Sequence, residues 1–392
     1  MKNFINALDL ISDFDVVVVV YDLVMGRDRI SELPDGLLNH ILMYLHIEES
    51  IRTSVLSSRW RKLWLKVPGL DVNVHDFPAD GNLFESLMDK FLEVNRGRLQ
   101  NFKLNYESNL YYLMDRFVPW IATVVDRGIQ HLDVTATDCP PWTIDFMPAN
   151  ICKSKTLVSL KLVNVGLDTP KFVVSLPCLK IMHLEDIFYS PLIAENLISG
   201  CPVLEDLTIV RNHEDFLNFL RVMSQTLKNF RLTFDWGMGS NDFSVEIDAP
   251  GLKYMSFRDS QSDRIVVKNL SSLVKIDLDT EFNLKFGLGS PLEPEDLTKR
   301  DIIRDFLTGI SSVKHMIISH PTLEVRTYIF EVSDVLYNTL IKCTLIFHMY
   351  HIHYPCRCFI VIPKSDSFQN SITYIICKLC SPAHCYNYCP PS

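Results

Sequence analysis

The most regular pattern in the chain is an apolar-x-x-apolar-x-apolar register that recurs along its middle. Successive copies start roughly 21 to 30 residues apart, with a gap of about 40 before the last. A repeat of this length predicts units that cannot bury their apolar faces alone and must stack on their neighbours. The copies are Leu99-Phe102-Leu104, Ile129-Leu132-Val134, Leu157-Leu160-Leu162, Leu179-Met182-Leu184, Leu204-Leu207-Ile209, Leu227-Phe230-Leu232, Leu252-Met255-Phe257, Leu273-Ile276-Leu278 and Val313-Met316-Ile318.

The residue between the second and third apolar positions is an independent test of this pattern. Eight of these nine residues are polar, which is the alternation of a short strand with one packed face and one open face. The pattern therefore predicts an α/β protein in which residues 99–327 form a solenoid with an exposed parallel sheet. Scattered strands of another α/β domain would not hold one register over so many units. The nine intervening residues are Lys103, Asp133, Lys161, His183, Thr208, Arg231, Ser256, Asp277 and Ile317.

The segments around these strands show two kinds of signal. Prolines 177, 202 and 250 each fall two residues before an apolar anchor and indicate a turn that leads into a strand. Helical spacing of apolar residues predicts helices within 82–94, 190–201, 214–226 and 293–310. Residues 71–98 are expected to connect the N-terminal region to the repeats.

A different pattern occupies residues 28–64. Pro34 indicates a helix start, and Leu37, Leu38, Ile41, Leu42 and Leu45 follow at helical spacing. A second helix is expected with Glu48 and Glu49 in its opening turn, and a third with Trp60, Leu63 and Trp64, ending at Pro68-Gly69. Three helices this short hold more apolar side chains than they can cover among themselves, which predicts a partner surface. The alternative is that each Leu is internal core and that the Trp side chains wedge the helices together.

The segments LPDGLLNHILMYL and ESIRTSVLSSRWRKLW resemble the F-box, and their sequence is similar to that of plant F-box proteins with leucine-rich repeats. The phrase CPVLEDL at 201–207 is similar to the repeats of the same family. The resemblance implies a three-helix F-box at 27–70, a curved leucine-rich-repeat solenoid, and binding to the Skp adaptor of a cullin-RING ubiquitin ligase. The positions that it assigns to Skp binding are Leu33, Pro34, Leu38, Ile41, Leu42, Leu45, Val55, Leu56 and Trp60.

The resemblance also implies that the open face of the sheet captures a protein substrate, which makes the chain a substrate receptor and not an enzyme. The alternative is a repeat scaffold that binds a partner without a role in ubiquitination. For each single residue of the open face, a merely solvated strand face is the competing interpretation. The candidate substrate contacts are Lys103, Asp133, Lys161, His183, Arg231 and Asp277.

Composition narrows the function classes further. The 392 residues carry a formal net charge of -9, which argues against nucleic acid or an anionic membrane as the main partner. A DNA-recognition helix containing Arg59 and Arg61 is the competing interpretation of RTSVLSSRWRKLW. We find no phosphate-binding glycine loop, no G-x-S-x-G and no HExxH, so the sequence predicts no catalytic residues, no cofactor and no metal.

The two ends of the chain differ from its middle. Asp9, Asp13, Asp15 and Asp22 flank the Val16–Val20 run, so residues 1–26 are expected to be an extension and neither a signal peptide nor a membrane span. This predicts a cytoplasmic or nuclear protein with mostly reduced thiols. Residues 328–392 lack the repeat register and form a Cys-rich tail. A zinc site at Cys377, Cys380, Cys385 and Cys389 is the weaker interpretation, because the loop between the two pairs is short.

Overall fold

The computed structural model describes residues 30–77, 82–107, 114–137, 144–190, 192–211, 217–234, 243–259, 262–280, 294–311, 313–319, 322, 344–351 and 354–362. The chain divides into two compact units, residues 1–183 and 184–392, and each is described by itself. The N-terminal extension and the four tail cysteines of the zinc interpretation lie outside the described residues.

The first unit begins with short helices, of which two are α-helices. The predicted third helix is wrong in kind: three-residue 3-10 helices follow α4, closed by bonds such as Leu63 N to Trp60 O at 3.2 Å and Lys66 N to Leu63 O at 2.8 Å. Turns of this tighter kind suit very short pieces, and here they place two bulky Trp side chains toward one core. The elements are η1 (Ile30–Glu32), α3 (Asp35–Leu42), α4 (Ile47–Arg52), η2 (Thr53–Val55), η3 (Trp60–Lys62) and η4 (Trp64–Lys66).

A parallel sheet follows, and it starts one strand earlier than the register predicts. β1 (Gly69–Asn73) pairs with β2, so Asp71 lies beside Lys103. Residues on β2 and β3 alternate between buried and open positions, as the apolar-polar pattern predicts. The sheet runs in the order β1-β2-β3-β4-β6 in this unit. The elements are η5 (Val74–Asp76), α5 (Asn82–Val94), β2 (Asn101–Glu107), α6 (Met114–Asp126), β3 (His131–Thr137), η6 (Ala149–Lys153), β4 (Ser159–Val163), β5 (Gly166–Leu167) and β6 (Ile181–Glu185), which ends in the second unit.

Helices α5 and α6 tie the short N-terminal helices to this sheet. The α5 helix forms over the predicted residues and packs on α6, where the indole of Trp120 donates to Asp89 at 2.9 Å. The buried amide of Asn95, just after α5, donates to the carbonyl of Val67 at 2.7 Å. The guanidinium of Arg127 then donates to the carbonyls of Asn95 and Leu92. These bonds join consecutive parts of the first unit into one packed body.

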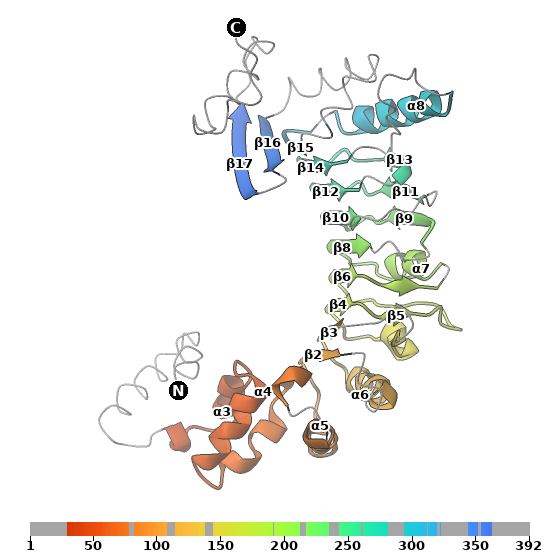
Figure 1. The fold of residues 1–392 in the computed structure, drawn as a ribbon. Coiled ribbons are helices and arrows are strands. Elements are labelled where there is room, and N and C mark those ends of the chain that lie inside the picture. Colours follow the sequence, from red (N-terminus) through yellow and green to blue (C-terminus); the bar gives the residue numbers. More distant parts are fainter. Residues whose placement is uncertain are drawn as a thin grey trace. The chain divides into compact units, whose positions relative to one another are not determined.

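The second unit continues the same architecture. β8, β10, β12, β14, β15 and β16 follow one another in parallel, and β17 pairs antiparallel to β16 (Figure 1). The long parallel sheet is therefore confirmed, whereas its curvature and the boundary at 327 stay predictions. The elements are β7 (Phe188–Tyr189), α7 (Ile193–Ser199), β8 (Asp206–Arg211), β9 (Phe219–Met223), β10 (Asn229–Phe234), β11 (Phe243–Asp248), β12 (Tyr254–Arg258), β13 (Ser262–Lys268), β14 (Lys275–Asp279), α8 (Pro294–Gly309), β15 (His315–Ser319), β16 (Thr344–His351) and β17 (Tyr354–Ile362).

One predicted helix of this unit is wrong. The predictions of helix within 190–201 and 293–310 are confirmed by α7 and α8, but residues 219–223 form strand β9. β9 pairs with β11, and β11 with β13, in a separate three-stranded parallel sheet. Leu220 and Val222 are buried by this pairing, so contacts with later segments of the chain outweigh the local helical spacing.

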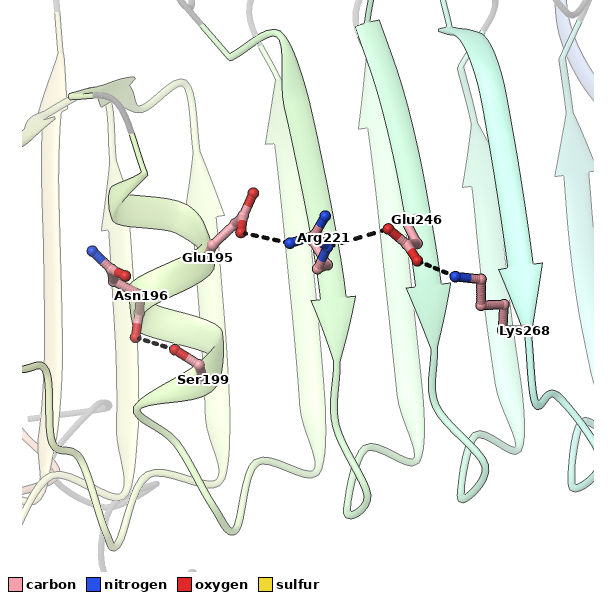
Figure 2. Close-up of polar contacts among 6 residues, drawn as sticks. All are labelled: Glu195, Asn196, Ser199, Arg221, Glu246 and Lys268. Carbon is pink, nitrogen blue, oxygen red and sulfur yellow. Dashed lines mark hydrogen bonds and ion pairs between the residues drawn. The ribbon is translucent and has the colours of Figure 1, made fainter.

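Helices cover both edge strands of this small sheet, because α7 packs against β9 and α8 against β13. A row of charges links α7 to the three strands (Figure 2). Arg221 lies 3.6 Å from Glu195 and 3.2 Å from Glu246, and Lys268 also donates to Glu246. The hydrogen bonds from Lys268 and then Arg221 lower the pKa of the Glu246 carboxyl.

Two hydrogen-bond patterns recur between neighbouring repeats. In several repeats one carbonyl accepts two consecutive amides of the next repeat, as Gln130 O does from Val158 N and Ser159 N, and Glu205 O from Lys228 N and Asn229 N. The second pattern is the motif S-x-T-L. Its threonine hydroxyl donates to the anchor carbonyl of the preceding repeat: Thr156 to Ile129 and Thr226 to Leu204, both at 2.8 Å.

We expect Thr226→Val, which keeps the shape but removes the hydroxyl, to lower the stability of the second unit by about 1 kcal/mol. The midpoint of urea unfolding measures this change. Thr208→Val on the open face of β8 is the matched control and should change the midpoint by much less. Equal effects of the two substitutions would contradict a stabilising role for the S-x-T-L motif.

The lowered pKa of Glu246 predicts a pH-dependent contribution to stability. A carboxyl whose pKa is lower in the folded state stabilises the fold above its unfolded-state pKa, and this contribution is lost as the pH falls through the folded-state pKa. Glu246→Gln should therefore destabilise by up to about 1 kcal/mol at neutral pH, and this loss should shrink steadily as the pH is lowered through the acidic range. Urea midpoints across a series of pH values test this. Ser244→Ala on the same strand should leave the pH dependence of unfolding as it is in the unaltered chain.

Candidate protein-binding surfaces

The apolar stripe of α3 lies inside the first unit. Leu38 is 0% exposed, Ile41 and Leu42 are 1% exposed, and Leu45 is 6% exposed. The expectation that a partner surface is needed to cover these leucines is therefore wrong for these four residues. The helices do not stand alone, because they pack on α5 and on β1 as well as on one another. A direct Skp contact by these side chains stays a prediction, and their evident role is to fix the position of α3.

The two tryptophans are also internal. Trp60 is 0% exposed and Trp64 is 8% exposed, which favours the interpretation that they wedge the helices together. The neighbouring Arg59 holds the start of α3: its guanidinium donates to the Asp35 carboxylate at 2.6 Å and to the Leu33 carbonyl at 2.6 Å. This contact gives Arg59 a structural role and removes one cation from the competing DNA-binding interpretation.

Other members of the predicted Skp-binding set are open to solvent. Val55 is 86% exposed and Leu56 is 54% exposed, so the end of η2 and the residue that follows it present two adjacent apolar side chains to water. Pro34 is also exposed and Leu33 is half-buried. Sequence reasoning missed Tyr44, which is 49% exposed and contacts His40 edge-on. The available signal was an aromatic residue outside the apolar stripe, one helical turn after His40.

The open face of the sheet in the first unit carries a row of alternating charges. Strand register places Asp71, Lys103, Asp133 and Lys161 side by side on β1 to β4. The Lys103 ammonium lies 3.2 Å from Asp71, and the Lys161 ammonium lies 3.7 Å from Asp133. The sheet thus brings together three of the predicted substrate contacts, and it adds Asp71, which the sequence had assigned to the connecting segment. We call these four residues the charge row.

The remaining predicted contacts are more varied. His183 on β6 is half-buried, and Arg231 on β10 lies 3.0 Å from Asp206. The prediction that Asp277 is exposed on the open face is wrong. Asp277 is only 6% exposed, and it accepts a hydrogen bond from Arg258 at 2.9 Å. Its register neighbours Ser256 and Ile317 are buried too. The middle of the β12–β14–β15 face is therefore closed, although the sequence pattern alone predicts it to be open.

The described residues offer little reactive chemistry. Burial raises the pKa of Cys152 to about 11, so its thiol stays protonated at neutral pH and is a poor nucleophile. Burial also raises the pKa of the Asp145 carboxyl, and the Tyr106 hydroxyl donates to this carboxyl at 2.9 Å. Among the described residues, no helix is both long enough and apolar enough to span a bilayer, and no cluster of three potential metal ligands occurs.

Comparisons with known proteins agree with this arrangement. Residues 30–70 match the F-box domain, and residues 117–277 match the leucine-rich repeats of the FBD-associated F-box protein At5g56370. The chain is 57% identical to F-box/FBD/LRR-repeat protein At2g26030 of Arabidopsis thaliana over 308 residues, which cover 77% of this chain and 69% of that relative. It is 53% identical to F-box/FBD/LRR-repeat protein At5g44980 of the same plant, over 75% of this chain and 68% of that relative.

The chain belongs to the plant F-box/LRR-repeat family. The F-box of this F-box/LRR chain spans η1 to the start of β1, and its matched repeats span α6 to β14. F-box/LRR-repeat protein 13 of Arabidopsis thaliana is a further relative, 43% identical over 76% of this chain and 66% of that relative. The predicted family is confirmed. The Skp-binding and substrate-binding roles of single residues stay predictions.

The different burial of two apolar F-box residues predicts a large loss of stability for one substitution and almost none for the other. Leu38→Ala leaves a cavity in a closed core and should cost about 2 to 5 kcal/mol of stability. Val55→Ala removes a side chain that water already surrounds and should stay within about 0.5 kcal/mol. Thermal unfolding of the two variants measures the difference. A large loss in Val55→Ala would show that η2 is packed in solution.

Proposed function

We propose that this F-box/LRR protein is a substrate-receptor subunit of an SCF-type cullin-RING ubiquitin ligase. In this proposal, the F-box binds the Skp adaptor and through it the cullin, while the open face of the sheet binds a target protein. The observation that carries the proposal is the F-box match over residues 30–70, in which Val55 and Leu56 remain exposed. Adjacent apolar side chains in water favour a partner that covers them.

The F-box side chains divide into two roles in this proposal. Pro34, Val55 and Leu56, with the half-buried Leu33, are open enough to contact an adaptor directly. The buried members of the predicted set hold these residues in place from below, so their loss would weaken adaptor binding through the fold. The buried members are Leu38, Ile41, Leu42, Leu45 and Trp60.

The proposed receptor works by position and supplies no acid, base or nucleophile. Tethering a target near a ubiquitin-loaded enzyme raises the effective concentration of its lysines. The packing of the F-box on α5 and β1 favours this role, because the adaptor-binding residues and the charge row then belong to one packed unit. The proposed compartments are the cytoplasm, the nucleus or both.

A second candidate is a repeat scaffold that binds a partner without a ubiquitin ligase. The two candidate functions make different predictions for Val55 and Leu56. A ligase subunit needs them to bind the adaptor, whereas a scaffold binds no adaptor.

We expect the full chain to co-purify with a plant Skp adaptor, and Val55→Glu with Leu56→Glu to lower recovery at least tenfold, because two charges would be buried against an apolar surface. Leu33→Ala with Pro34→Ala should lower recovery as well. Val173→Glu, at a residue of the same unit that is 87% exposed, is the matched control and should leave recovery unchanged. Equal recovery of all variants, or no recovery of the unaltered chain, would favour the scaffold.

A further inference from the structure

The charge row offers a partner a regular spacing as well as alternating charge. Its residues Asp71, Lys103, Asp133 and Lys161 occupy equivalent positions on four adjacent parallel strands. Adjacent strands lie about 4.8 Å apart, so the row extends about 14 Å across the sheet. The four side chains are between 27% and 42% exposed, so a partner can reach all of them.

This spacing distinguishes between the two regular backbones that a partner can present. An α-helix rises about 1.5 Å per residue, so its positions i, i+3, i+7 and i+10 lie on one face and span about 15 Å. An extended strand places same-face residues about 6.7 Å apart and would span about 20 Å over the same three steps. A helix that crosses the strands therefore stays in step with the row, whereas an extended peptide loses register.

The charges define the side chains that such a helix needs. We propose that the open face of β1 to β4 binds an α-helix of a partner protein, and that this helix carries basic and acidic residues in alternation at i, i+3, i+7 and i+10. This inference rests on the proposed function, in which the sheet captures a protein. Each partner charge then faces an opposite charge of the row.

The surroundings of the row are consistent with this partner. The ion pairs within the row are exposed and therefore weak, so a helix can share these charges without breaking a strong contact. Two acidic and two basic residues cancel in net charge, and a nucleic acid would instead require a basic surface. The neighbouring positions on the same face add hydrogen-bonding side chains without acidic or strongly basic groups. Six of these eight positions are Asn101, His131 and Ser159 on one side, and Asn73, Asn105 and Thr135 on the other; the remaining two, Gly69 and Val163, have no hydrogen-bonding side chain.

The test uses the full chain and two stapled helical peptides of equal composition and matched helicity. The alternating peptide carries lysine, glutamate, lysine and glutamate at i, i+3, i+7 and i+10, and the block peptide carries lysine, lysine, glutamate and glutamate there. A simple sign reversal would be a poor control, because a helix bound in the opposite direction restores the match. We expect the alternating peptide to bind about tenfold more tightly, measured by fluorescence anisotropy at low salt.

A charge exchange in the protein should reverse this preference. Lys103→Glu with Asp133→Lys converts the row to two acidic residues followed by two basic residues, which matches the block peptide. The control exchange Arg221→Glu with Glu246→Arg lies on the separate sheet of the second unit and should leave the preference unchanged. If the first exchange does not fold, Lys161→Glu serves instead and should weaken the alternating peptide about threefold.

Three results would overturn the inference. They are no binding of either peptide to the unaltered chain, equal binding of both, and a preference that the exchange leaves unchanged. The peptides do not contact the F-box, so the two proposals can fail separately. If one of these three results is found while the chain still co-purifies with the Skp adaptor, only the helix inference is wrong. Loss of adaptor recovery with retained peptide preference would instead overturn the ligase proposal.

Discussion

The structure depends on the burial of one apolar face of each strand by the next segment of chain. Leu132, Leu160, Leu207 and Phe230 are all between 0% and 1% exposed, and each strand presents alternate residues outward. Burial on this scale is the dominant favourable contribution to folding. The repeated carbonyl that accepts two amides fixes the spacing from repeat to repeat, and the S-x-T-L hydroxyl adds a side-chain contact at the same place. Because the inner face is committed to packing, variation in function is confined to the outward positions.

The F-box illustrates how one pattern can serve two purposes. An amphipathic stripe indicates that a helix packs against an apolar surface, but it does not indicate whether that surface belongs to the same chain. In α3 the surface belongs to the chain itself, since Leu38, Ile41 and Leu42 are enclosed. The two adjacent apolar residues left open, Val55 and Leu56, lie at the end of η2, a 3-10 helix too short to form a stripe. An adaptor surface assembled from such short pieces depends on the core beneath them for its shape.

Charge on the outer surfaces is organised by strand register. The row Asp71, Lys103, Asp133 and Lys161 in the first unit alternates in sign from strand to strand. In the second unit, Glu195 of α7, Arg221, Glu246 and Lys268 also alternate in sign, and there only Arg221 and Glu246 are register partners. Like charges directly opposite on neighbouring strands are destabilising, so alternation suits a parallel sheet whose equivalent residues stand in line. The same alternation gives each surface a definite pattern for a partner to match.

The sequence by itself determined the strands of the repeats, several of the helices and the family of this protein. The period of the apolar triplets located nine strands, helical spacing located α5, α7 and α8, and the F-box wording identified the N-terminal module, because these signals reside within short stretches of chain. Tertiary structure alone decided the rest. β9 is a strand because β11 lies beside it, Asp71 joins the row because β1 pairs with β2, and Asp277 is buried although its pattern is that of an open position. Each of these outcomes depends on which residues distant in sequence meet in space, and a local pattern of polarity does not specify that meeting.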